Sequence, residues 1–250
     1  MLNLQKIASL ATGTAMLALG MLSATPARSA TMVLDFETGN GLLPPGQGQI
    51  INGAGLFTDF GVTIGTTNPN NNPLLLFNSN CGPDFPGVPC TGNDGDLASG
   101  PSFGTAPQGN VLIIQNDGSA ITNPNDDPDG GTIEFSFDSP VTFKSANILD
   151  LDEGVGPISF KFFFEGDPVG QIINPTDIEL LGDTTGDNSL REFKFNNLKN
   201  VKRVDVTLND VSGAIGSLTY ALQEVPEPAS VMGLLAVGIL GVLKRKQSNS

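Results

Sequence analysis

The chain of 250 residues has no histidine, no tryptophan, one tyrosine and two cysteines. Without histidine it cannot assemble a Ser-His-Asp or Cys-His catalytic set, or most zinc hydrolase sites. A pair of carboxylates could still serve a glycosidase. Sugar-processing clefts, however, use aromatic platforms, and only Tyr220 and the phenylalanines are available here. We therefore predict that the protein is not an enzyme.

Basic residues are missing from the whole stretch between Thr31 and Phe143, which carries twelve acidic residues. Over residues 31–228, seven Lys and Arg face 26 Asp and Glu, a net charge of −19. Such a field repels nucleic acid and anionic membrane surfaces and attracts cations. DNA and RNA are therefore excluded as partners. Two interpretations of the acidity stay open: solubility outside the cell, and a specific cation site.

The two cysteines, Cys81 and Cys90, are separated by only eight residues. In an exported chain such a pair is expected to form a disulfide that closes a loop, worth roughly 2–3 kcal/mol of stability. Two free thiols are the alternative. A zinc site is disfavoured, because two thiolates without histidine do not complete its ligand set.

The amino-terminal segment has the three parts of a secretory signal. Lys6 precedes an apolar run over residues 7–22, and small residues follow it. Ala27 and Ser29 fit the −3 and −1 positions of a signal peptidase site, so we predict cleavage before Ala30 and a signal peptide over residues 1–29. An uncleaved membrane anchor is the weaker alternative, because the apolar run is short.

The carboxyl-terminal segment, residues 225–250, also has three parts. Pro226-Glu227-Pro228 is followed by an uncharged apolar run over 231–243 and by Lys244-Arg245-Lys246. The run would span about 20 Å as a helix, short of the roughly 30 Å hydrocarbon core. Its place before a terminal basic cluster nevertheless favours a short transmembrane helix that stops translocation.

This order of elements resembles the PEP-CTERM sorting signal, which exosortases recognise. The resemblance implies transient anchoring in the inner membrane and cleavage near Pro226, Glu227 and Pro228. It further implies delivery to the cell surface or the extracellular matrix, where such proteins are associated with exopolysaccharide and biofilm.

Between the two ends, the pattern is that of strands. Ile133, Phe135 and Phe137 alternate with polar residues, as do Phe193 and Phe195. Further runs of strand character are 31–37, 56–64, 73–78, 110–116, 140–152, 158–164, 204–208 and 214–222. We therefore predict an all-β domain over residues 30–224, a jelly-roll-like antiparallel β-sandwich with about ten to twelve strands. The signal helix and the short carboxyl-terminal helix flank it.

A weaker resemblance lies in the middle of the chain. The segments 74–80, 93–97, 109–116, 131–138 and 148–153 are similar to a β-sandwich module of bacterial surface proteins. The loop between Cys81 and Cys90 is an insertion relative to that pattern. The module resembles calcium-stabilised carbohydrate-binding sandwiches, which implies a glycan-associated role.

Calcium is the best candidate ligand, because it takes six to eight oxygens and tolerates irregular loops. Asp94 and Asp96 flank a glycine, and Asp150, Asp152 and Glu153 follow a strand. We predict that these five residues share a calcium ion; the alternative is that each caps a turn and faces water. A second acidic run, residues 125–129, contains Pro128 and is interpreted as a solvated turn.

Two functional hypotheses follow for this exported protein, whose processing partners would be signal peptidase and exosortase. The first is a matrix module that binds exopolysaccharide and is stabilised by calcium. The second is a structural surface or spacer protein without a dedicated ligand.

Overall fold

Two strands of 20 residues each, β6 (Gly130–Leu149) and β10 (Leu190–Asn209), run through the whole domain. The computed structural model describes residues 30–37, 48–51, 55–116, 122–151, 158–182 and 186–223. The shorter strands are β1 (Thr31–Leu34), β2 (Ile50–Ile51), β3 (Val62–Thr67), β4 (Leu74–Asn78), β5 (Asn110–Ile114), β7 (Ile158–Phe164), β8 (Gln171–Ile172), β9 (Asp177–Leu180) and β11 (Ala214–Leu222). Four short 3-10 helices complete the described part: Thr58–Phe60, Gly82–Asp84, Thr91–Asn93 and Pro101–Phe103.

All the pairings between named strands are antiparallel and join them into one sheet in the order β2-β4-β5-β11-β6-β10-β7-β8. Strand β1 pairs with β11, β3 with β6, and β9 with β10. The all-β antiparallel prediction is thereby confirmed. Jelly-roll-like connectivity stays a prediction.

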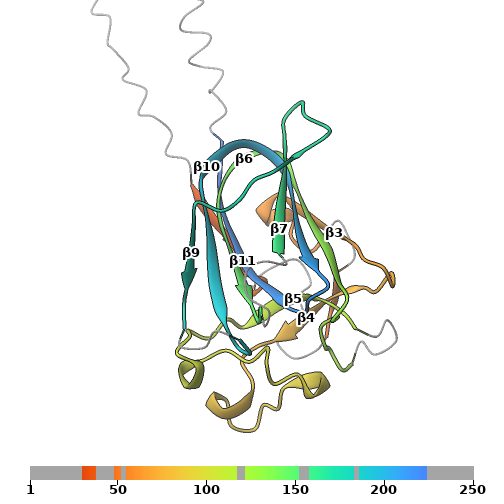
Figure 1. Cartoon of the computed structure of the whole chain (residues 1–250), viewed down its shortest axis with the longest axis vertical. Helices are drawn as coiled ribbons and strands as arrows, with labels where there is room; N and C mark the ends of the chain where they lie inside the picture. Colours follow the sequence, from red (N-terminus) through yellow and green to blue (C-terminus); the bar gives the residue numbers. More distant parts are fainter. Residues whose placement is uncertain are drawn as a thin grey trace, which may run out of the picture. The chain divides into compact units, whose positions relative to one another are not determined.

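Both long strands bend near their middle, and the bend folds the sheet over on itself (Figure 1). In β10 the register shifts between Lys194 and Arg203, and Asn197 and Asn200 adopt positive φ values of 47° and 61°. Asparagine tolerates this left-handed conformation better than most residues, which lets the strand turn without glycine. In β6, Pro140 lies at the bend, between Ser136 and Val141, where the pairing with β10 is interrupted and the missing N–H of proline is tolerated.

The bend divides the sheet into two layers. The first layer contains β11, the second half of β6 and the first half of β10, with β1, β5 and β9 beside them. The second contains β3, the first half of β6, the second half of β10, and β7. The sequence predicted two separate sheets. It could not show that two strands pass through both layers.

Phenylalanine rings fill the space between the layers. The Phe195 ring of the first layer lies 5.0 Å, centroid to centroid, from both Phe160 and Phe162 of the second. Phe143 lies 5.3 Å from Phe162 in the same way. Aromatic pairs at this spacing add about 0.5–1.5 kcal/mol each to the stability that their burial provides. The predicted inward face of Ile133, Phe135 and Phe137 is buried in this core as well.

A second, smaller core lies on the other side of β4 and β5. Leu74 and Leu76 face the main core, whereas Leu75 and Phe77 face Leu97, Ala98 and Cys81. The long segment between β4 and β5 therefore covers an apolar face of the sheet. Because this segment is mostly polar, its sequence does not indicate that it covers the sheet.

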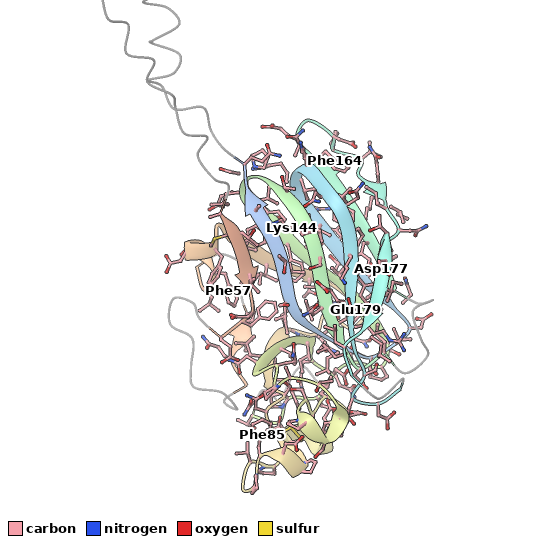
Figure 2. All side chains as sticks on the ribbon, turned by 90° about the vertical axis from the view of Figure 1, so that its left-hand side faces the viewer. Phe57, Phe85, Lys144, Phe164, Asp177 and Glu179 are labelled. Atoms are coloured by element: carbon pink, nitrogen blue, oxygen red, sulfur yellow. A yellow bond between two sulfur atoms is a disulfide. The ribbon has the colours of Figure 1, made fainter. Side chains whose placement is uncertain are left out.

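The two ends of the domain differ in character. At the bend end, Leu222 pairs with Val141; at the opposite end, Ala214 pairs with Leu149 and long connections gather, so we call it the loop end. Phe164 lies toward the bend end and Phe85 at the loop end, as Figure 2 shows.

The strand predictions succeeded best for regular segments. Strands β7 and β11 have the predicted bounds, while 132–138 and 140–152 merge into β6. The short strands β2, β8 and β9 were not predicted. The signal peptide and the 231–243 helix lie outside the described residues. Among the described ones, no helix is long and apolar enough to cross a membrane.

Candidate functional site

Two nearly buried aspartates meet at the loop end. Asp94 follows the Thr91–Asn93 turn, and Asp126 lies between β5 and β6; their exposed fractions are 4% and 7%. The backbone amide of Asp126 donates a hydrogen bond of 3.2 Å to Oδ2 of Asp94. The amide of Gly213, just before β11, donates one of 2.6 Å to Oδ2 of Asp126. The two carboxylates are thus fixed by backbone groups from separate parts of the chain.

Both carboxyl groups are shifted toward the protonated form. Burial raises the pKa of Asp94 well above its ordinary range, and the neighbouring Asp96 and Asp126 carboxyls raise it further. Burial, followed by the charge of Asp96, raises the pKa of Asp126 to about 7. Carboxylates held together without solvent repel one another until protons or a cation neutralise them. This cluster can therefore take up positive charge.

Asn188 connects this cluster to the end of β6. Its side-chain Nδ2 donates to the carbonyl oxygens of Gly95, Asp96 and Ala98 at 2.7, 2.7 and 2.9 Å. Its backbone N lies 2.9 Å from the Asp96 carbonyl and 3.2 Å from Oδ1 of Asp150. No sequence pattern singled out Asn188. Its role depends on a left-handed φ of 62° between distant segments.

The structure brings part of the predicted calcium set to the loop end. Asp94 and Asp96 are neighbours there, and Asp150, fully buried with a φ of 62°, joins them through Asn188. Asp152 and Glu153 lie outside the described residues. Within the described ranges, no three Asp, Glu or Cys side chains are grouped closely enough to hold a metal ion as they stand.

The second acidic run contradicts the prediction of a solvated turn. Asp126 belongs to the buried cluster, and Asp127 is only 3% exposed, with its Oδ2 accepting a 2.7 Å hydrogen bond from Asn72. Only Pro128 and Asp129 face solvent as predicted. Proline restricts one residue's φ, but it does not decide whether its neighbours are buried.

Cys81 and Cys90 form a disulfide, the pairing expected from their spacing. Cys81 is 1% exposed and packs in the smaller core, so the bond joins the loop segment to the outer face of β4 and β5. The Gly82 amide also donates to the Val88 carbonyl at 3.0 Å. The loop that this disulfide closes lies at the loop end (Figure 2), where the aspartates also lie, and it stabilises that end of the domain.

A hollow of about 520 Å³ lies at the bend end, beside Phe163, Lys202 and Arg203. The Arg203 guanidinium covers the Phe163 ring at 3.9 Å and pairs with Asp205 at 2.9 Å. The protein's own arginine therefore occupies a face of the ring against which a sugar would stack.

The strongest comparison concerns the carboxyl-terminal end. Residues 224–247 match the PEP-CTERM protein-sorting motif. The resemblance read from Pro226-Glu227-Pro228, the apolar run and the basic tail is thus confirmed. The motif implies export, sorting by exosortase, and a cell-surface or membrane-associated destination. No curated protein and no solved structure matches the chain.

The residues of that motif, Pro226, Glu227 and Pro228, lie outside the described residues, as do Ala27 and Ser29 of the predicted signal peptidase site. What the structure describes is the domain between them. The resemblance of its middle segments to carbohydrate-binding sandwiches stays a prediction.

Proposed function

We propose that this protein is a module of the cell surface or extracellular matrix, released there after exosortase cleaves at Pro226-Glu227-Pro228. The match of residues 224–247 to the sorting motif carries this proposal. The acidic domain, one loop of which is closed by a disulfide, suits an oxidising medium outside the cytoplasm. Its ligand would be exopolysaccharide, with which proteins bearing this motif are associated.

Cell fractionation tests the sorting step. With exosortase present, the protein should reach the surface fraction without its basic tail. In a strain lacking exosortase, or with Glu227→Ala, it should stay in the membrane fraction at full length. Equal release from both strains would contradict the proposal.

We further propose that the buried aspartates at the loop end take one calcium ion. Asp94, Asp96 and Asp126 support this, because their repulsion and burial would both be relieved by a divalent cation. Calcium that binds only the folded state would add about 2.7 kcal/mol of stability at 100 times its Kd. Magnesium should substitute poorly, since it demands a tighter octahedral shell.

Thermal melts in calcium and in chelator test this site. Asp94→Asn should remove most of the calcium-dependent rise in Tm, whereas Asp129→Asn, which changes an exposed acid nearby, should not. A Tm unmoved by millimolar calcium would leave the aspartates as a protonated structural cluster.

A purely structural role is the second candidate. The covered ring of Phe163 favours it, because a free aromatic platform would be expected of a sugar-binding groove. A glycan array with the domain decides between the two: calcium-dependent binding supports the matrix ligand, and silence across neutral and acidic glycans supports the spacer.

A further inference from the structure

The first and last strands of the domain meet at the bend end. Strand β1 pairs antiparallel with β11, with Thr31 opposite Ala221 and Leu34 opposite Leu218. The chain therefore enters the domain where it leaves it. Lys144 of β6 fixes the entry point by donating a 2.7 Å hydrogen bond to Oγ1 of Thr31.

Strand β11 is an interior strand, although it is the last to be made. One edge pairs with β6 from Ala214 to Leu222, and the other pairs with β1 and β5. Its side chains Leu218 and Tyr220 are fully buried. The sheet therefore stays incomplete until the last residues of β11 have crossed the membrane.

Very little chain separates this interior strand from the Pro-Glu-Pro element of the sorting motif, whose match begins at residue 224. Only residues 223–225 lie between Leu222 and Pro226, so an extended backbone spans at most about 14 Å between those two residues. A protease binds its substrate as an extended segment. Residues of β11 cannot be drawn into a protease without breaking hydrogen bonds on both edges of the strand.

We infer that exosortase cleaves this protein against the bend end of the folded domain, and that residues 223–225 are a spacer of near-minimal length for that cleavage. This inference rests on the proposed sorting function. Folding and cleavage are coupled, because the completed ladder limits how much chain the protease can use.

A spacer deletion in a host with exosortase tests this coupling. Removing residues 223–225 places Pro226 directly after Leu222 and leaves every described strand intact. Cleavage, followed by pulse-chase labelling, should slow by at least about tenfold, since displacing a reacting bond by about 1 Å already costs up to about 100-fold. Replacing the same three residues by Gly-Ser-Gly restores the length and should restore the wild-type rate.

A destabilised variant, Leu218→Asp, distinguishes two reasons why the deletion could slow cleavage. Either the folded domain lies too close to the cleavage site, or residues that exosortase recognises have been lost. In the deletion background Leu218→Asp should restore cleavage, because β11 no longer forms a closed ladder next to the motif. If the variant lacking residues 223–225 were cleaved at the wild-type rate, the inference would be overturned and the proposed sorting function would stand. Failure of the wild-type chain itself to be cleaved would instead overturn the proposed function.

Discussion

Asn188 donates two hydrogen bonds to a single acceptor, the carbonyl oxygen of Asp96: one from Nδ2 at 2.7 Å and one from its backbone N at 2.9 Å. The same side chain also reaches the carbonyls of Gly95 and Ala98. One asparagine thus fixes the segment that carries Asp94 and Asp96. The geometry of the whole loop end depends on it.

We therefore expect Asn188→Gly to lower the free energy of unfolding by about 1–3 kcal/mol, because the buried carbonyl of Ala98 and the part-buried carbonyl of Gly95 lose their donor. Glycine keeps the left-handed backbone at no steric cost, so the loss isolates the side-chain amide. Asn197→Gly is the matched control: it too has positive φ, but it is exposed and should change stability by less than about 0.5 kcal/mol. Urea unfolding measures both, and equal effects would contradict the role of Asn188.

The disulfide gives a second prediction. Replacing Cys81 and Cys90 together by serine should cost roughly 2–3 kcal/mol, the chain entropy of a loop this short. The loss should appear as a lower urea midpoint in the double variant than in the oxidised wild type. An unchanged midpoint would mean that the smaller core holds the loop without the bond.

The pKa of Asp126 predicts a pH dependence in chelator. Its folded-state pKa is raised to about 7 from an ordinary value of 3.8, mainly by burial. The folded protein then keeps a proton that the unfolded chain releases, so this group's contribution to stability falls as pH rises from about 4 to 7. Asp126→Asn should remove that fall. If the free energy of unfolding of the wild type instead increased with pH in this window, relative to that of Asp126→Asn, the raised pKa of a buried Asp126 would be contradicted.

Tyr220 offers an independent test in the alkaline range. Burial raises its pKa to about 12, and its hydroxyl donates a 2.7 Å hydrogen bond to the Phe60 carbonyl. Stability from this group should be complete below about pH 10 and should be lost as pH rises toward 12. Because it is the only tyrosine, ultraviolet absorbance of tyrosinate reports it directly. Titration at the ordinary pKa, or an alkaline loss retained in Tyr220→Phe, would contradict this.

The sequence predicted those parts of the fold that depend on local periodicity. Strand β7, with Phe160 and Phe162 alternating inward, is an example. It could not predict the bends of β6 and β10, because these arise from pairing with partners in both layers. It also missed β9, whose residues are all exposed and carry no buried face to signal a strand.

The candidate site was predictable only in part for a similar reason. Paired aspartates around a glycine indicated Asp94 and Asp96, but Asp126 lay in a run that proline and asparagine made look solvated. Its burial is decided by a backbone amide 87 residues away, that of Gly213. Contacts of this range leave no local pattern in the chain.

Intact-mass spectrometry of the native surface form tests the central claim most directly. The sorting account predicts a single species that begins at Ala30 and ends near Pro228, and it predicts the full carboxyl terminus in cells without exosortase. A surface species that retains Lys244-Arg245-Lys246 would contradict it.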